Sequence, residues 1–508
     1  MAATDREGGT AEQVREQVAH ALQRARAAQA RWASTSPRER ARVLRGARER
    51  LRAGAEAAVA ALASDLGKPP HEALTTEVVA DVELFDWWCR HAPRLLAPRR
   101  VRLDPLHYPG KRAWIERAPA GVLGLITPWN LPVAIPLRTI VPALLAGDAV
   151  VWKPSELAPA SARFVASLFT ELLPADLLVV LPGAPAYGAA LAAAGCDRLC
   201  FTGSAATGRK VARAAAETLT PVSLELGGKD AAIVCADVDL ERAARGIVWA
   251  AFYNAGQNCA ALQRCYVERA IYERFEERVV ALARTLRAGP GGELPPLASP
   301  AQLERVAAQL EDAQRRGARV LCGAQRHQER WYLPTVLAEV PPDALVLQEE
   351  TFGPVLSLVA VANAEEAVAQ ANASPYGLTA SIWTRDLARA RALARRLAAG
   401  VVTVNNHAFT GALPMLPWGG LKASGHGVTS SPHALEHLTQ PRAVVIDRGQ
   451  GPGDVWWYPY TETLLELARG SLRLLGGGLG RLAALPRLLG ALRRRQRELC
   501  GEPARPGP

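Results

Sequence analysis

One cysteine in this sequence stands in a setting that suits nucleophilic chemistry. Cys259 ends the run 254–259, Asn-Ala-Gly-Gln-Asn-Cys. A lone cysteine usually packs as a small apolar side chain, but the polar, glycine-containing run before it argues against that role. A thiol is a good nucleophile because even a small thiolate fraction reacts fast near neutral pH. We therefore interpret Cys259 as a candidate nucleophile.

A carboxylate and an amide stand in two further motifs. Glu225 ends an apolar, strand-like run and precedes two glycines and Lys229. Burial there would raise the pKa of the carboxyl toward the range of a general base; the alternative is a structural ion pair with Lys229. Asn130 lies between Pro128 and Pro132, which restrict the backbone. A fixed amide suits an oxyanion hole, although a plain rigid turn would show the same pattern.

Three segments have features of a dinucleotide site. Residues 201–208 lead from a predicted strand into a helix, where backbone N–H groups can hold a pyrophosphate. This run is not GxGxxG, and it departs from a P-loop because Arg209 and Lys210 replace Lys and Ser/Thr. Residues 150–156 end a strand with a cation and an acid, which could bind a ribose or form a surface ion pair. Residues 349–355 contain an acid, an aromatic ring and Gly-Pro, or form a simple turn.

The elements that must position these motifs alternate between strands and helices. Residues 11 to 98 predict helices, one of them beginning at a capping box, Ser36-Pro37-Arg38-Glu39. An irregular stretch around 101 to 117 suggests a hairpin outside the main sheet. The predicted strands are 122–126, 149–152, 177–181, 199–201, 222–226 and 231–234. This alternation predicts an α/β fold with a doubly wound parallel sheet, whose ligands bind at the carboxyl ends of the strands.

Composition excludes several classes of protein. The 508 residues, 49% of them hydrophobic, allow two or three domains with large cores. The net charge is +11, but most of the basic residues are interspersed with acidic ones, so nucleic-acid binding is not predicted. Eight cysteines without zinc spacing predict neither a disulfide scaffold nor a metal site. The absence of a secretory signal and of a long uncharged apolar run favours a cytoplasmic location.

Taken together, the motifs resemble the aldehyde dehydrogenase superfamily over about residues 15 to 446. The resemblance implies that Cys259 is the nucleophile, Glu225 the general base and Asn130 the oxyanion amide. It also implies an NAD site, with NADP as the alternative cofactor. The implied cofactor-binding residues are Ile126, Thr127, Trp129, Lys153, Glu156, Gly203, Ser204, Leu226, Glu350 and Phe352.

The same resemblance implies a domain organisation. A Rossmann-like NAD(P)-binding domain is expected at 1–99 and 119–227, and an α/β catalytic domain at 228–424. An oligomerisation β-extension is expected at 100–118 and 432–446, which favours a homodimer or tetramer. Beyond the part that resembles the family, residues 447–508 are expected to form an additional helical, basic tail.

The implied function is oxidation of an aldehyde to a carboxylic acid with NAD(P)+, through a cysteine thiohemiacetal and thioester. Two alternatives remain: a cysteine thioester hydrolase or esterase, or a catalytically idle member that acts as a membrane-surface scaffold. The sequence also departs from the family, because Gly427-Val428-Thr429 replaces the common Gly-Arg-Glu. This departure and the tail favour apolar substrates.

The tail loosely resembles the end of the fatty-aldehyde branch of the family. Between Arg469 and Arg497 it has eight arginines, no acid and many leucines. Such a basic amphipathic stretch predicts peripheral membrane contact through 462–499, or packing on the enzyme or a partner subunit. Gly476–Gly478 and Pro486 are expected to break it into short helices.

Overall fold

The computed structural model describes residues 10–104, 108, 110–449, 452–475 and 480–501. The chain divides into two compact units, one comprising Met1–Ala97 and Arg117–Pro441 and the other Pro98–Glu116 and Arg442–Pro508. The first contains both large sheets and is α/β, as predicted.

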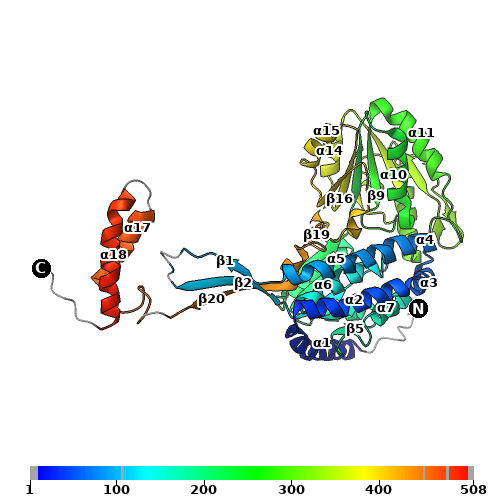
Figure 1. Ribbon diagram of the computed structural model, residues 1–508. Coiled ribbons are helices and arrows are strands. Elements are labelled where there is room, and N and C mark those ends of the chain that lie inside the picture. The colour runs from blue at the N-terminus through cyan, green and yellow to red at the C-terminus, as the bar shows by residue number, and fades with distance from the viewer. Residues whose placement is uncertain (1–9, 105–107, 109, 450–451, 476–479, 502–508) are drawn as a thin grey trace. The chain divides into compact units, whose positions relative to one another are not determined.

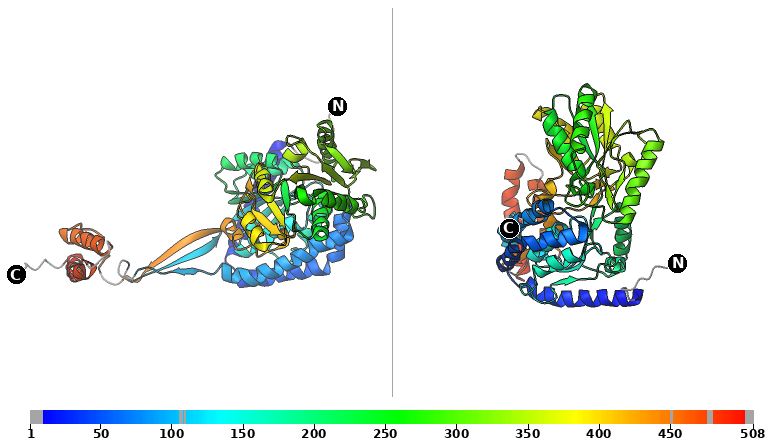
Figure 2. Two further views of the ribbon diagram at one scale, coloured as in Figure 1. Left: turned by 90° about the horizontal axis from the view of Figure 1, so that it is seen from above. Right: turned by 90° about the vertical axis from the view of Figure 1, so that its right-hand side faces the viewer.

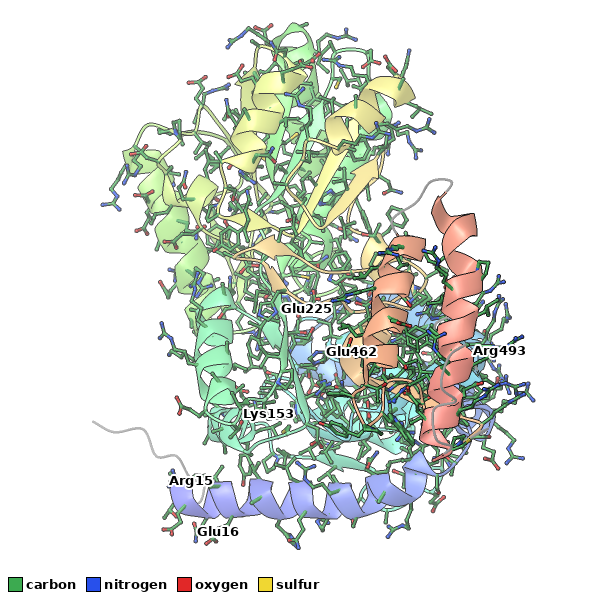
Figure 3. All side chains as sticks on the ribbon, turned by 90° about the vertical axis from the view of Figure 1, so that its left-hand side faces the viewer. Arg15, Glu16, Lys153, Glu225, Glu462 and Arg493 are labelled. Carbon is green, nitrogen blue, oxygen red and sulfur yellow. The ribbon has the colours of Figure 1, made fainter. Side chains whose placement is uncertain are left out.

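The N-terminal part of the first unit is helical. The predicted capping box is present, because Ser36 and Glu39 exchange side-chain and backbone hydrogen bonds at the start of α2. Figure 3 labels Arg15 and Glu16 near the N-terminal end of α1, and both side chains are exposed. The helices before the first sheet, with one π-helical turn, are α1 (Ala11–Ala33), α2 (Pro37–Ala53), α3 (Ala55–Leu66), α4 (Pro70–Ala73), η1 (Leu74–Val79) and α5 (Ala80–Leu95).

The first large sheet has the strand order β19-β7-β6-β3-β4-β5 and is parallel except for β19. The chain winds outward from β3 through β4 and β5, then returns to β6 and β7 on the other side of β3. The fold is therefore doubly wound, with the switch point between β3 and β6. The strands are β3 (Val122–Ile126), β4 (Ala149–Lys153), β5 (Leu178–Val180), β6 (Arg198–Gly203), β7 (Val222–Leu226) and β19 (Gly425–His426). The first five confirm the predicted strands. The helices around it are α6 (Ala134–Ala146), α7 (Pro159–Ser167), α8 (Pro185–Ala193), α9 (Ala205–Ala216) and α16 (Ala434–Leu438).

The second large sheet has the order β10-β13-β14-β9-β8-β16-β17, with only the edge strand β10 antiparallel. Figure 1 shows α10 and α11 on one face and α14 and α15 on the other. The strands are β8 (Asp230–Val234), β9 (Leu262–Glu268), β10 (Arg319–Cys322), β13 (Thr335–Ala338), β14 (Val355–Val361), β16 (Thr379–Trp383) and β17 (Val401–Val404). The helices are α10 (Leu240–Phe252), α11 (Tyr272–Ala283), α12 (Pro300–Arg315), α13 (Leu345–Gln348), α14 (Ala364–Asn372) and α15 (Leu387–Ala394), with 3-10 turns η2 (Tyr253–Gly256), η3 (Arg269–Ile271) and η4 (Thr410–Ala412). Short pairs complete the unit: β11 (Arg326–His327) with β12 (Trp331–Tyr332), and β15 (Tyr376–Gly377) with β18 (Leu421–Lys422).

The second unit contains a small antiparallel sheet and a helical hairpin. The predicted hairpin is present as β1 (Arg99–Val101) and β2 (Lys111–Pro119), and β20 (Thr439–Asp447) adds a third strand. The tail forms α17 (Glu462–Leu475) and α18 (Gly480–Leu499), which lie side by side in Figures 1 and 2.

One expectation for the tail is wrong. Pro486 lies inside α18 and does not end it. A proline removes one helical hydrogen bond, yet the remaining turns continue on either side; α5 and α6 also contain a proline. The Gly476–Gly478 run lies outside the described residues. No described helix is long and apolar enough to cross a membrane.

Candidate active site

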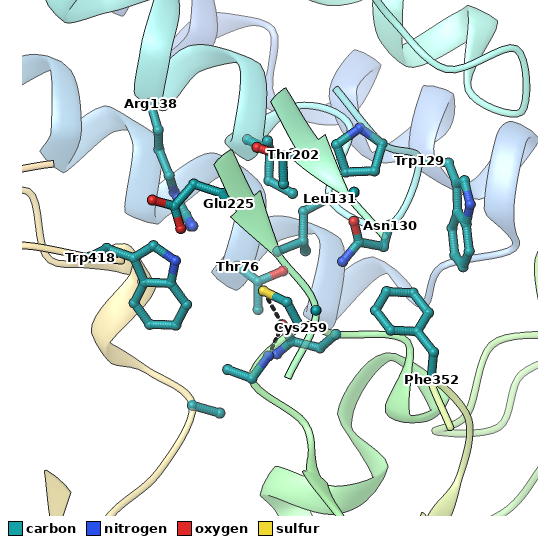
Figure 4. A pocket seen from close by; sticks show the side chains of 18 of the residues that line it. Thr76, Trp129, Asn130, Leu131, Arg138, Thr202, Glu225, Cys259, Phe352 and Trp418 are labelled. Carbon is teal, nitrogen blue, oxygen red and sulfur yellow. Dashed lines mark hydrogen bonds between the residues drawn. The ribbon is translucent and has the colours of Figure 1, made fainter. Parts of the chain in front are cut away.

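A cavity of about 520 Å³ brings together most of the predicted site residues (Figure 4). Both large sheets contribute to its walls, through β6 and β7 of the first and the segment before β9 of the second. The predicted residues that line it are Trp129, Asn130, Gly203, Ser204, Glu225, Leu226, Cys259, Glu350 and Phe352. Thus the three proposed catalytic side chains, which are up to 129 positions apart in the sequence, face one space.

Cys259 follows a tightly wound turn. Asn254, Ala255 and Gly256 have φ of 52°, 52° and 70°, a left-handed conformation that only glycine adopts without strain. A Cβ on Gly256 would stand 2.1 Å from the carbonyl oxygen of Gly353, so this position has no room for a side chain. The turn explains the polar run before the cysteine and delivers the thiol into the cavity.

The surroundings of Cys259 oppose ionisation of the thiol. Burial first, and then the carboxylates of Asp230, Glu350 and Glu225, raise its pKa to about 12, while Arg138 lowers it. The sulfur lies 3.6 Å from Oδ1 of Asn258. In this state the residue is a thiol near neutral pH, so it must lose its proton as it reacts.

Glu225 is buried and has no ion-pair partner among the described residues. Both carboxyl oxygens lack a hydrogen-bond donor, and burial holds the pKa well above its ordinary value despite the nearby backbone N–H of Thr429. Lys229 does not pair with it, because its Nζ donates to Gln263 at 2.7 Å and to Thr351 at 2.9 Å. The structural ion pair considered above is therefore wrong, and a carboxyl with a raised pKa is suited to proton transfer.

Asn130 is held through both its side chain and its backbone. Its side-chain Nδ2 donates to the carbonyl of Gln257 at 3.2 Å, and its backbone carbonyl accepts from Asn254 at 3.1 Å and from Lys68 at 3.1 Å. One of the two Nδ2 hydrogens thus has a backbone partner, which leaves the other for a ligand in the cavity.

Glu350 and Phe352 form another wall. Glu350 accepts from the backbone N–H of Gly228 at 3.2 Å, and burial raises its pKa to about 7. A Cβ on Gly227 would lie 2.2 Å from this carboxyl, so a side chain there would displace Glu350. Phe352, with φ of 55°, meets the Trp129 ring edge-on at 5.5 Å.

The remaining predicted cofactor residues lie at the carboxyl ends of β3, β4 and β6. Ser204 caps α9 by accepting from the Thr207 N–H. Ile126 is in register with Lys153 on the neighbouring strand, and the N–H of Thr127 donates to the Lys153 carbonyl at 3.2 Å. Figure 3 labels Lys153 and Glu225 on the same unit. Lys153 and Glu156 form an ion pair at 3.2 Å with Glu156 about half exposed, so both the ribose site and the surface ion pair remain compatible with the geometry. The four residues Ile126, Thr127, Lys153 and Glu156 lie outside the cavity lining.

Sequence reasoning missed several cavity residues. Trp249 and Tyr253, whose rings stack at 5.5 Å, and Trp418 supply aromatic surface, and Arg138 supplies a cation without a hydrogen-bond partner among the described residues. Trp249 and Tyr253 are four positions apart across the end of α10, a spacing that could have indicated a shared face. The signal for Arg138 was its place inside an otherwise apolar helix, α6. Among the described residues no cluster of His, Cys, Asp or Glu could hold a metal ion.

Comparison with known proteins agrees with this architecture. The Aldehyde dehydrogenase family pattern matches residues 3–444. A 4,4'-diapolycopene aldehyde oxidase of Methylomonas sp is 36% identical over 414 residues, 81% of this chain and 78% of that protein. An aldehyde dehydrogenase of Mycobacterium tuberculosis solved with NAD+ is 35% identical with a TM-score of 0.81, covering 86% of this chain and 91% of that chain. An NAD-dependent aldehyde dehydrogenase of Sinorhizobium meliloti is 32% identical with a TM-score of 0.83, covering 88% and 89%.

These matches give no support to the hydrolase or idle-scaffold alternatives. A family pattern that covers most of the sequence, together with relatives above 30% identity over most of their own length, shows that the chain belongs to the aldehyde dehydrogenase family.

Proposed function

We propose that this enzyme oxidises an aldehyde to a carboxylic acid with NAD(P)+, with Cys259 as nucleophile, Glu225 as general base and Asn130 as oxyanion donor. The observation that carries the assignment is the convergence of these three side chains on one cavity (Figure 4). Arrangements of a nucleophile, a base and a fixed donor around one space are what acyl chemistry requires.

The residues present fit a dinucleotide. Gly203 and Gly227 stand where a Cβ would lie 2.6 Å from Phe201 and 2.2 Å from Glu350, so a side chain at either position would displace the neighbouring side chain from this wall. We assign Gly203, Ser204 and the start of α9 to the pyrophosphate, because helix N-termini attract anions. Lys153 and Glu156 are assigned to the adenosine ribose.

The nicotinamide end is assigned to the opposite part of the cavity wall. Glu350 would accept hydrogen bonds from the second ribose, and Phe352 would pack against the ring. Ile126, Thr127, Trp129 and Leu226 complete the proposed site. When bound, the nicotinamide supplies the acceptor for the hydride that leaves the aldehyde carbon.

The first chemical stage is acylation of the enzyme. As the Cys259 sulfur adds to the carbonyl carbon, the thiol proton passes to water in the cavity and a tetrahedral oxyanion forms. The Asn130 amide and the Cys259 backbone N–H would donate to that oxygen; loss of one such donor costs about 10²–10³-fold in rate. Loss of hydride from the carbon then leaves a thioester on Cys259.

The second stage is hydrolysis of the thioester. Glu225 in its carboxylate form removes a proton from water, which attacks the acyl carbon and releases the acid and the Cys259 thiol. The carboxylate is reactive because no hydrogen bond or counter-ion of the described residues stabilises it. This role agrees with the burial that raises its pKa.

We further propose apolar, long-chain aldehydes as substrates, because aromatic and aliphatic side chains dominate the cavity beyond Cys259. These are Leu131, Ile135, Trp249, Tyr253, Phe409 and Trp418. The test is an aldehyde panel with NAD+ and NADP+, pairing each alkanal with an aldehyde of equal length that ends in a carboxylate. Higher kcat/KM for the alkanals is expected; a preference for the carboxylates would instead give Arg138 the dominant role. No NAD(P)H formation with any aldehyde would refute the function.

The second unit carries a separate proposal, peripheral attachment to an anionic membrane through 462–499. Supporting it are four exposed aromatic rings before α17, Trp456, Trp457, Tyr458 and Tyr460. Exposed leucines on α17 and arginines on α18 suit an interfacial segment. Figure 3 shows Arg493 on the side of α18 away from α17.

We keep the predicted domain assignment as a proposal. Residues 1–99 and 119–227 would bind the cofactor, 228–424 would carry the nucleophile, and the β-extension at 100–118 and 432–446 would join subunits in a homodimer or tetramer. Three antiparallel strands with open edges support this last role, because an unpaired edge is a ready site for another chain. Light scattering on the full chain tests it, and a monomer at micromolar concentration would refute it.

A further inference from the structure

A buried ion pair lies directly behind the turn that carries Asn130. The side chains of Lys68 and Glu77 are 0% exposed and contact each other. Lys68 comes after α3, just beyond the left-handed Gly67, and Glu77 lies in the π-helical turn η1. Charges this deeply buried are stable only when paired and hydrogen-bonded.

The two partners of the pair hold the Asn130 turn from both sides. Lys68 Nζ donates to the Asn130 carbonyl at 3.1 Å. Glu77 Oε2 accepts from the backbone N–H groups of Val133 at 2.9 Å and Ala134 at 3.2 Å, where α6 begins. Among the described residues, the other hydrogen bonds of the pair therefore go to backbone within four residues of the proposed oxyanion donor.

The same stretch of chain also reaches the turn before Cys259. Glu72 Oε2 accepts from the Asn254 N–H at 3.1 Å, and the Asn254 side chain donates both to the Asn130 carbonyl at 3.1 Å and to the Gln257 carbonyl at 3.0 Å. The Gln257 carbonyl is also the acceptor for the Asn130 amide. The amide and the turn before the nucleophile are thus tied to one scaffold.

The other side of η1 faces the substrate. Thr75 and Thr76 of η1, and Ala80 after it, line the cavity. Single π-helical turns recur at functional sites because the extra residue shifts the side chains that follow. Here the turn presents Glu77 to the backbone N–H groups of Val133 and Ala134, while its threonines form a cavity wall.

We propose that Lys68 and Glu77 are positioning residues that fix the Asn130 amide for the acylation stage. This inference rests on the proposed role of Asn130. Oxyanion stabilisation requires the donor to be aimed before charge develops, so a small displacement of the turn would slow acylation without weakening cofactor binding or thioester hydrolysis. If the pair only stabilised the fold, its loss would lower the free energy of unfolding. It would not slow acylation more than cofactor binding or thioester hydrolysis.

The experiment is a double-mutant cycle between the pair and Asn130. The variant Lys68→Met/Glu77→Gln is neutral overall, and Gln keeps an acceptor oxygen for Val133 and Ala134 while the donor to the Asn130 carbonyl is lost. It is measured alone and combined with Asn130→Ala. The readouts are the first-turnover rate of NADH formation, thioester hydrolysis, and the dissociation constant of NAD+.

The expected result is an acylation rate about tenfold lower for the Lys68→Met/Glu77→Gln variant, with NAD+ affinity and hydrolysis unchanged. In the Asn130→Ala background the same substitutions should cause no further loss. The matched control is Arg40→Met, which removes a buried cation beside Gly147 at the opposite end of α6. It should lower the melting temperature and leave the acylation rate within twofold.

Two outcomes would overturn the inference: an unchanged acylation rate in the folded pair variant, or the same loss with and without Asn130. If the pair variant fails to fold, Lys68→Arg takes its place; it keeps the charge but displaces the donor, and the same cycle applies. If Asn130→Ala alone leaves acylation unchanged, the proposed role of Asn130 is wrong. If Asn130→Ala slows acylation but the effects add, only the inference about the pair fails.

Discussion

The two units of this chain use buried polar groups in different ways. In the first unit, the cavity contains the Glu225 carboxyl, which has no hydrogen-bond partner among the described residues, and the Cys259 thiol, whose pKa is raised to about 12. Leu224 and Leu226, on either side of Glu225, belong to a large apolar core, and Cys259 packs against a smaller apolar cluster. In the tail of the second unit, the buried charge is Arg495, which donates to the carbonyls of Val455 and Trp457 and contacts Glu498.

The second unit also has far less apolar core. Of its tail side chains that the structure describes, only Leu467, Ala491 and Arg495 are buried, while the aromatic rings of residues 456–460 are largely exposed. The first unit can therefore tolerate unsatisfied, reactive groups because its core is large. In the described part of the tail, by contrast, the buried charge of Arg495 is fully hydrogen-bonded, and apolar side chains are exposed. We therefore expect chemistry to depend on the first unit alone and surface attachment on the second.

The largest effect is expected for Cys259→Ala. Without the sulfur no covalent adduct can form, so NADH formation should fall to the uncatalysed rate, while titration with NAD+ should give an unchanged dissociation constant. Turnover by this variant would show that the reactive group lies elsewhere.

Glu225→Gln should slow steady-state turnover by about 10²–10⁴-fold, because a positioned base contributes that much. The first-turnover burst of NADH should survive. In the wild type, the raised pKa of Glu225 means that hydrolysis increases as pH rises through that pKa, since only the carboxylate is a base. Measurement of the burst and the steady state between pH 5 and 10 checks both points, and a pH-independent hydrolysis rate would contradict the assignment.

The raised pKa of Glu225 makes folding stability fall as pH rises, whereas hydrolysis increases. Burial favours the protonated form of Glu225, so its contribution to folding is present at low pH and is lost as pH rises through the folded-state pKa. Glu225→Gln should therefore lose less stability than the wild type between pH 6 and 9, as followed by the denaturation midpoint. If the denaturation midpoints of the wild type and of Glu225→Gln changed in parallel with pH, that result would be inconsistent with a buried carboxyl at position 225.

Glu156→Gln should have a smaller effect, confined to the cofactor. A carboxylate at this position repels a 2′-phosphate, and Glu156 is half exposed beside Lys153. The ratio of kcat/KM for NADP+ to that for NAD+ should rise about tenfold, with the aldehyde KM unchanged. If the ratio of kcat/KM for the two cofactors did not change, Glu156 would form only a surface ion pair with Lys153 and would not bind the cofactor.

The smallest effect on chemistry is expected from removal of the tail. A 1–448 truncation should keep kcat for a short aldehyde within twofold, yet lose co-sedimentation with anionic vesicles. Trp456→Ser/Trp457→Ser in the full chain should weaken co-sedimentation while α17 and α18 remain. Equal partition of full-length and truncated proteins would end the membrane proposal, and a large loss of activity would contradict the division of roles between the units.

Much of the fold and of the site was predictable because short local sequence patterns indicate the strands, the turns and the motifs. Short apolar runs gave the strands of the first sheet, and the motifs around Glu225 and Cys259 lie where strands end or tight turns occur. The Ser36 capping box was likewise local.

What the sequence did not predict depends on long-range packing. Lys68 and Asn130 are 62 positions apart, and no local pattern predicts that they meet. The alternative that Lys229 pairs with Glu225 rested on their closeness in sequence, whereas Gln263, 34 positions away, is the partner in space. Pro486 was expected to break the tail, yet the hairpin packing of α17 and α18 retains the helix.

The central claim is that one carbonyl meets the thiol of Cys259, the amide of Asn130 and the carboxylate of Glu225 in a single cavity. The most direct measurement is mass spectrometry of Glu225→Gln after brief exposure to an aldehyde and NAD+. The account predicts one acyl group on the peptide that contains Cys259, formed in proportion to the NADH released. NADH production with an unmodified Cys259 peptide would contradict it.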